Sequence, residues 1–117
     1  MYKANTKRAF FYSNGVMKNL GALGGLDSIG IDINNKGQVV GWYTGKNYQG
    51  YFRHAFVYRN NKMVDLNNLI DPASGWELFG ANSINDAGWI VGEAKNNLSP
   101  FPIRSSFLAI PCPNSSC

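Results

Sequence analysis

The sequence predicts an all-β protein, and three observations support that prediction. Short apolar runs rich in β-branched and aromatic residues recur along the chain. Gly, Asn and Pro bound most of these runs, as expected for strands joined by tight turns. The chain also contains an internal repeat, and no run has the length or the period of about 3.6 residues that indicates a helix.

The first repeated motif predicts a hairpin. The stretch RAFFYSNGVMKNLGAL (8–23) aligns with HAFVYRNNKMVDLNNL (54–69). Asn14-Gly15 predicts a type I′ turn, because both central residues of that turn need positive φ, and Asn61 replaces the glycine in the second copy. The runs AFFY and AFVY lack polar alternation, which predicts strands covered on both faces.

The second repeated motif predicts another hairpin. DINNKGQVVGWY (32–43) aligns with SINDAGWIVGEA (83–94), and the larger offset here comes from five residues inserted within IDPASGWELFG (70–80). In both copies Asn leads a predicted type I turn, and the Gly three residues later takes the left-handed position of a bulge. The repeated turn is therefore interpreted as scaffolding, with Asn and Gly placed where backbone geometry requires them.

These motifs predict one all-β domain over residues 1–117, with internal repeats at 8–45 and 54–95 and a partial third at 105–111. Each full repeat is expected to form a four-stranded antiparallel meander, the size of a propeller blade. Two and a half blades cannot close a ring. The chain is therefore a piece of a longer protein, or several copies complete a ring, or the repeats fold on each other as a sandwich or barrel, and we favour the last two.

Charge is unevenly distributed along the chain. Residues 1–62 hold nine basic and two acidic side chains, a net charge of +7, whereas residues 63–117 hold two basic and five acidic ones, a net charge of −3. This is either scatter over a solvated surface or a means of steering one copy onto another as a homo-oligomer. The basic residues stand singly, so we expect no nucleic-acid partner.

The sequence contains neither a signal-peptide pattern nor a run of 18 apolar residues, so we expect no membrane partner. Cys112 and Cys117 close the chain in the tail CPNSSC. The two cysteines can form a local disulfide or remain free thiols, and the sequence leaves both alternatives open. No His or further Cys accompanies them, so no zinc site is expected.

The repeat resembles a known family. HAFVYRNNKMVDLNNL, the following SINDAGWIVGEA and the terminal SSFLAIP are similar to the HAF repeat, a bacterial extracellular repeat named for His-Ala-Phe. Arg8 and Ser105 replace the His in the first and third copies. The resemblance implies a propeller-like arrangement and an extracellular or periplasmic location, with no residue carried over as catalytic; without a signal peptide, the cytoplasm stays open.

No catalytic constellation is visible. His54 is the only histidine, and its counterparts in the other copies are not imidazoles, so we expect a structural role. Asp86 is interpreted as a turn residue rather than a calcium ligand, because Asn35 stands at the same place one repeat earlier. The acidic residues Asp65, Asp71, Glu77 and Glu93 form no recognisable pair. We therefore predict no catalytic residue, no metal and no cofactor.

Aromatic residues around WYTGKNYQGYF (42–52) are the strongest indication of a binding site. Rings beside Gly and amide side chains suit carbohydrate, and loops on β scaffolds often carry ligands, although packing of these rings in a core is the plainer interpretation. The candidate ligand-binding residues are Trp42, Tyr43, Tyr48, Tyr51 and Trp76. We predict a non-enzymatic module that binds a glycan or a protein. The alternatives are a hydrolase whose acids meet only in the fold, and a self-assembling structural unit.

Overall fold

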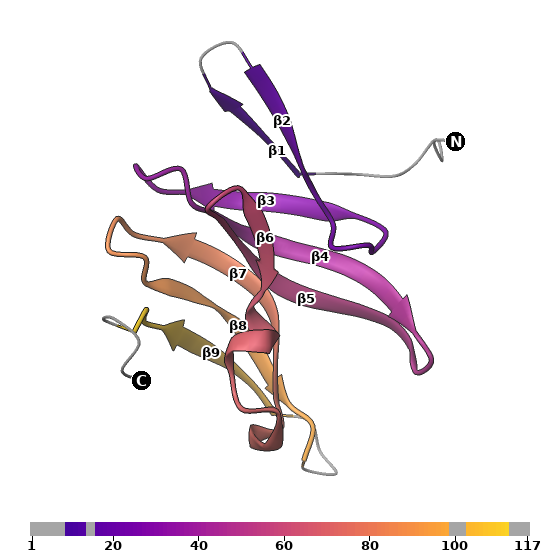
Figure 1. Ribbon diagram of the computed structural model, residues 1–117. Helices are drawn as coiled ribbons and strands as arrows, with labels where there is room; N and C mark the ends of the chain where they lie inside the picture. The colour runs from indigo at the N-terminus through magenta and orange to yellow at the C-terminus, as the bar shows by residue number, and fades with distance from the viewer. Residues whose placement is uncertain (1–8, 14–15, 99–102, 113–117) are drawn as a thin grey trace.

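The computed structural model describes residues 9–13, 16–98 and 103–112 (Figure 1). These residues form nine β-strands and two short 3-10 helices: β1 (Ala9–Ser13), β2 (Val16–Gly21), β3 (Ser28–Ile33), β4 (Val39–Asn47), β5 (Gly50–Arg59), β6 (Lys62–Asp65), η1 (Leu66–Leu69), η2 (Pro72–Ser74), β7 (Trp76–Ile84), β8 (Ile90–Asn96) and β9 (Ile103–Ala109). The all-β class predicted from the sequence is confirmed.

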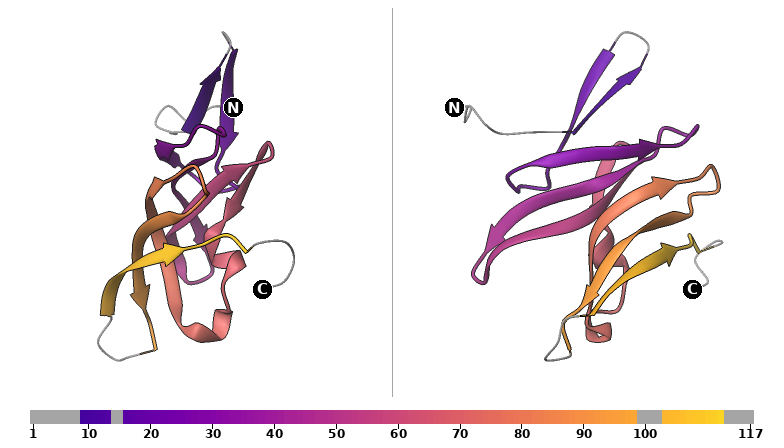
Figure 2. Two further views of the ribbon diagram at one scale, coloured as in Figure 1. Left: turned by 90° about the vertical axis from the view of Figure 1, so that its left-hand side faces the viewer. Right: turned by 180° about the vertical axis from the view of Figure 1, so that it is seen from behind.

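The described strands form three open antiparallel sheets, ordered β1-β2, β3-β4-β5-β6 and β7-β8-β9. Figures 1 and 2 show the β1–β2 hairpin at one end, the four-stranded sheet in the middle and β7–β9 at the other end. Among the described residues no sheet closes into a barrel, and no propeller ring is formed.

The sheets are grouped differently from the sequence repeats. The four-stranded sheet joins the second hairpin of repeat 8–45 to the first hairpin of repeat 54–95, so the expected meander within each repeat is not what forms. Connection length explains the difference. Only residues 48–49 separate β4 from β5, whereas residues 22–27 and 66–75 precede β3 and β7, and two-residue connections make neighbouring antiparallel strands.

The central part of the middle sheet is packed on both faces. One face, with Val39, Tyr43 and Phe56, packs on Ala9 and Leu20 of the β1–β2 hairpin. The opposite face packs on β7–β9 through a second core cluster: Val40, Ala55, Val57, Leu66, Leu78, Ala81, Ile84, Ile90 and Ala94.

The prediction that AFVY is covered on both faces is confirmed, since residues 55–58 are all buried. In AFFY the same prediction is wrong for Phe10, which is 60% exposed although its repeat counterpart Phe56 is 0% exposed. The reason is positional, because within the described residues no sheet lies beyond the β1–β2 hairpin.

The predicted turns are present wherever the structure describes them. Asn60 and Asn61 have φ of 52° and 62°, as a type I′ turn requires. The turns at 34–37 and 85–88 both close with a hydrogen bond from the Gly amide to the leading Asn carbonyl. Asn14-Gly15 lies outside the described residues.

Equivalent turns of the two repeats bond to each other across adjacent sheets. The backbone N–H of Asn35 donates to Asp86 Oδ1 and its Nδ2 donates to Oδ2, both at 2.8 Å. Asn34 Nδ2 also donates to the Asn85 carbonyl at 2.9 Å. Each of these pairs is 51 residues apart, which is the repeat offset, so the turns stack in register. Asp86 lies in the 85–88 turn, as predicted, and its carboxylate accepts both hydrogen bonds from Asn35.

Candidate functional site

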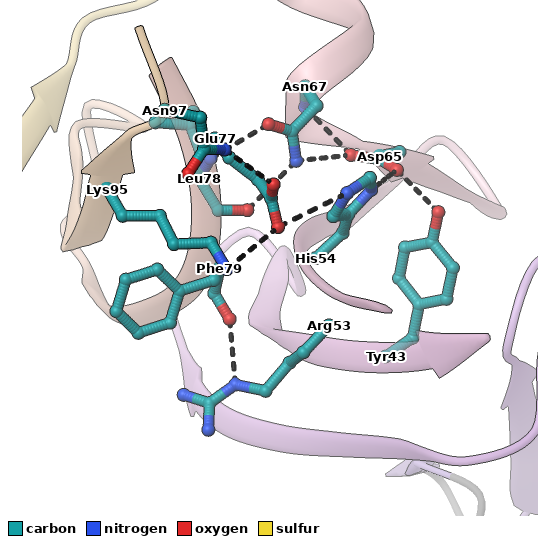
Figure 3. Close-up of polar contacts among 10 residues, drawn as sticks. All are labelled: Tyr43, Arg53, His54, Asp65, Asn67, Glu77, Leu78, Phe79, Lys95 and Asn97. Carbon is teal, nitrogen blue, oxygen red and sulfur yellow. Dashed lines mark hydrogen bonds and ion pairs between the residues drawn. The ribbon is translucent and has the colours of Figure 1, made fainter. Parts of the chain in front are cut away.

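A polar network lies at the centre of the molecule, where β4, β5 and β6 meet (Figure 3). Asp65 ends β6, and its buried carboxylate accepts a hydrogen bond from the Tyr43 hydroxyl. His54 Nδ1 lies 2.7 Å from the same carboxylate oxygen. The sheet register positions these groups, because Tyr43 and His54 are cross-strand partners and β6 runs beside β5.

The network extends to β7 through Asn67 and Glu77. Asn67, in η1, donates to Asp65 Oδ1 from both its backbone N–H (2.8 Å) and its side-chain amide (3.0 Å). Its amide group also exchanges two hydrogen bonds with the backbone of Leu78, like a strand partner. On the other side of the imidazole, Glu77 Oε1 lies 3.9 Å from His54 Nε2. The network thus joins the middle sheet to the next one.

The environment of Asp65 favours its charged form. Burial raises the pKa of this carboxyl, but the hydrogen bonds from His54, Tyr43 and Asn67 together outweigh burial and hold the pKa below its usual 3.8. Burial, followed by the hydrogen bond and the charge of Asp65, raises the pKa of Tyr43 above its usual 10.0. Asp65 is therefore an anion and Tyr43 a neutral donor at neutral pH.

This convergence was missed by the sequence analysis, which found no recognisable pair among the acidic residues. His54 stands between two carboxylates, an arrangement that fixes the orientation of the ring. The signal that would have revealed it is the hairpin register, since a tight Asn60-Asn61 turn brings the strand ends carrying His54 and Asp65 together. Neither of the two pockets described below is lined by His54.

An apolar hollow lies on the inner face of the β7–β9 sheet, beneath the loop that carries η2. Its volume is about 290 Å³. It is lined by Ile70, Asp71, Ser74, Trp76, Leu78, Ala94, Ser105, Ser106 and Phe107. We call it the Trp76 pocket. The inserted segment within residues 70–80 supplies one wall, and β8 and β9 supply the floor.

The Trp76 pocket occupies the position that the Tyr43–His54 pair fills one repeat earlier. Ala94 and Ser105 are cross-strand partners, just as Tyr43 and His54 are, and both members of the pair are shifted by 51 residues. The side chains at these places in β8 and β9 are small, so a hollow remains where the middle sheet holds a phenol and an imidazole.

A second, larger pocket of about 510 Å³ lies between η1 and the C-terminal segment, lined in part by Leu66, Leu69, Ile110 and Cys112. Cys112 is disulfide-bonded, so the free-thiol alternative is wrong for it, whereas Cys117 lies outside the described residues.

The predicted aromatic residues do not form one surface. Tyr43 is buried in the core, and its hydroxyl donates to Asp65. Trp42 is held beneath the guanidinium of Arg53, 4.1 Å from the ring centroid. Tyr48 and Tyr51, 95% and 75% exposed, lie at the tip of the β4–β5 hairpin, which projects away from η2 (Figure 2).

Trp76 is thus the one predicted residue that lines a described pocket. In the part of the chain that the structure describes, no group of three or more His, Cys, Asp or Glu residues is arranged to hold a metal ion. No helix there is long and apolar enough to cross a membrane.

Comparison with known proteins identifies the family. A family model described as "Protein of unknown function (DUF3466)" matches residues 13–105, which is most of the chain. The chain belongs to the DUF3466 family. The match spans most of the strands, the polar network and the lining of the Trp76 pocket except Ser106 and Phe107. No curated protein and no solved structure matches this DUF3466 chain.

Proposed function

We propose that this DUF3466 chain is a non-enzymatic binding module whose ligand site is the Trp76 pocket. The observation that carries the proposal is the hollow at Ala94 and Ser105, where the equivalent place in the middle sheet is filled. A rigid sheet forms its floor, an inserted loop forms its rim, and a partly exposed indole stands at its edge. Ligand sites are commonly apolar hollows with a few polar groups that fix orientation.

The lining suits a neutral sugar ring. Trp76 and Phe107 offer aromatic surface to the apolar face of a pyranose, and the carboxylate of Asp71 can accept hydrogen bonds from its hydroxyls. Ser105, the cross-strand partner of Ala94, adds a hydroxyl group. A volume of about 290 Å³ lies near the lower end of the roughly 300–1,000 Å³ typical of ligand pockets, which favours one sugar residue at a time.

The compartment belongs to the same proposal. The resemblance to the HAF repeat implies export to the periplasm or the cell exterior, and the disulfide at Cys112 fits an oxidising compartment. Glycans are abundant partners there, so the location and the pocket chemistry agree.

We favour binding over hydrolysis because of how His54 is held. One ring nitrogen is bonded to Asp65 and the other faces Glu77, and neither described pocket reaches the ring. A general base needs a free nitrogen within reach of substrate. The network is better suited to joining β5, β6 and β7.

A panel of neutral mono- and disaccharides, screened on an array and followed by calorimetry, tests the proposal. We expect binding that Trp76→Ala weakens at least about tenfold, the loss of about 1.4 kcal/mol or more. Tyr48→Ala is the matched control, since it removes an exposed aromatic at the hairpin tip, outside the pocket. Binding lost in the Tyr48 variant and kept in the Trp76 variant would move the site to the hairpin, and no binding at all would overturn the proposal.

A further inference from the structure

The larger pocket, between η1 and the C-terminal segment, also has a small residue where the middle sheet has a tyrosine. Ile90 in β8 and Ala109 in β9 are cross-strand partners, and both line this pocket. Their counterparts 51 residues earlier, Val39 and Tyr58, are cross-strand partners too. Tyr58 is buried in the cluster that joins the middle sheet to the β1–β2 hairpin. Ala109 fills much less space, so a hollow of about 510 Å³ remains between β9 and the middle sheet.

The lining of this pocket is aliphatic and carries one cation. Val57, Leu66, Ile90 and Ile110 are typical of its wall. Arg59 is the one charged residue among the twelve that line it, and none of the others has a side-chain hydroxyl, amide or carboxyl group. We call it the Arg59 pocket. Such a lining offers little to the hydroxyls of a sugar, whereas it suits an aliphatic chain that ends in one anionic group.

The strand geometry directs Arg59 toward the hollow. Val57, two residues earlier in β5, packs in the cluster shared with β7–β9, and alternate residues of a strand face the same side. The side chain of Arg59 is partly buried. With the residues that the structure describes, it forms no ion pair and no side-chain hydrogen bond. A guanidinium is a planar fork of donors, which matches the two oxygens of a carboxylate.

The charges around the Arg59 pocket favour an anion. Lys62, the cross-strand partner of Arg59, brings a second cation to the same strand end. No acidic residue is among the described residues that line the pocket. The carboxylates of Asp65 and Asp86 are bonded within the polar network and between the stacked turns, and Asp71 lines the Trp76 pocket. None of these three therefore occupies the site where a ligand carboxylate would meet Arg59.

We propose that the Arg59 pocket binds a straight-chain aliphatic carboxylate, the chemical class of a medium-chain fatty acid. Its chain lies between η1 and β9, and its carboxylate pairs with Arg59. The volume is within the roughly 300–1,000 Å³ typical of ligand pockets. Ile70 and Leu78 line both this pocket and the Trp76 pocket, so they form the wall between two sites of different chemistry. The proposal does not depend on sugar binding.

Calorimetry with octanoate and decanoate, and with octanol and decanol, tests this site in the full chain. We expect affinity to rise roughly fourfold for each added methylene, because apolar chain is buried. Each carboxylate should bind at least about tenfold more tightly than its alcohol, because it gains a charged hydrogen bond. Arg59→Gln should remove that difference by weakening the carboxylates alone. Lys46→Gln is the matched control, since it removes one positive charge outside the pocket and should change neither affinity.

Filling the hollow provides the second test. Ala109→Tyr gives β9 the side chain that β5 has at Tyr58, so binding of carboxylates and alcohols should both be lost. Circular dichroism must show that this variant is folded; if it is not, Ala109→Leu replaces it and should weaken both ligands. Trp76→Ala should bind octanoate as the wild type does.

Four results would overturn the proposal. The first is a wild type that binds no carboxylate, and the second is one that binds carboxylate and alcohol equally. The third is an Arg59→Gln variant with wild-type preference, or a folded Ala109→Tyr variant with wild-type affinity. The fourth is octanoate binding that Trp76→Ala abolishes, which would move the carboxylate to the sugar pocket.

Discussion

The pair Tyr43–His54 in the middle sheet and the pair Ala94–Ser105 in the β7–β9 sheet occupy equivalent places and do different things. Both are cross-strand partners in the same register. The first pair is tied to Asp65 and fills its space, while the second lines a hollow beside Trp76. One backbone pattern therefore supports a structural network in one repeat and a candidate binding site in the next, and side-chain volume decides which.

Equivalent positions in the two repeats also contribute differently to stability. The filled place joins three strands and η1 through hydrogen bonds to one carboxylate. Ala94 and Ser105 make no comparable hydrogen bonds to a buried carboxylate, so substitutions there should affect the fold less. We expect substitutions at the two places to differ in both size and kind of effect.

The largest effect is expected from emptying the filled place. Tyr43→Ala removes a buried ring and leaves Asp65 without one of its donors, so the free energy of unfolding should fall by about 3–5 kcal/mol. Urea denaturation followed by circular dichroism measures the change. Tyr48→Ala serves as the control, with a change within about 0.5 kcal/mol because that ring is in solvent. Equal effects in the two variants would contradict the buried role of Tyr43.

The next effect concerns the charge at the centre of the network. Asp65→Asn should lower the free energy of unfolding at pH 7 by about 2–3 kcal/mol, because hydrogen bonds to a charged acceptor are lost. The folded pKa of Asp65 lies below the usual 3.8, so its contribution is complete above that pH and is lost as the pH falls through the folded value. Unfolding curves from pH 7 to pH 2 should show a steeper acid loss in the wild type than in the variant. Parallel pH profiles would exclude this role.

The smallest effect on stability is expected from filling the hollow place. Ala94→Tyr introduces into β8 the side chain that β4 has at Tyr43, and the Trp76 pocket offers it room. We expect the free energy of unfolding to change by less than about 1 kcal/mol, whereas Ala81→Tyr, in a fully packed part of the same sheet, should cost about 1–3 kcal/mol or more.

Sugar binding, measured by calorimetry, should be lost in Ala94→Tyr and not in a folded Ala81 variant. A strongly destabilised Ala94 variant would mean that the hollow does not accept a ring. Binding that survives a folded Ala94→Tyr would place the ligand elsewhere.

Much of the fold was predictable because turns are encoded locally. Asn60-Asn61 and the Gly residues at 37 and 88 stand where positive φ is needed, and this fixes the hairpins and the all-β class. The grouping of hairpins into sheets was not predictable from the repeat alone, because repetition defines a unit without saying where a sheet begins. The two-residue connection between β4 and β5 decided that.

The candidate site was predictable only in part. Trp76 was selected because it lies in an insertion, and it does line a pocket. Tyr43 was grouped with Trp42 because they are adjacent in sequence, yet neighbours in a strand point to opposite faces, and Tyr43 turned into the core. The meeting of His54, Asp65 and Glu77 depends on contacts between elements, which no local pattern encodes.

The five residues inserted before β7 have a consequence for evolution. In perfect tandem copies every repeat would offer the same surface, so a ligand would find several equivalent binding sites and no unique one. The insertion that carries η2 makes one repeat different from the other at this point. The hydrogen bonds from Asn35 to Asp86 keep the two adjacent sheets in register. A duplicated scaffold can in this way gain an individual site without redesigning its strands.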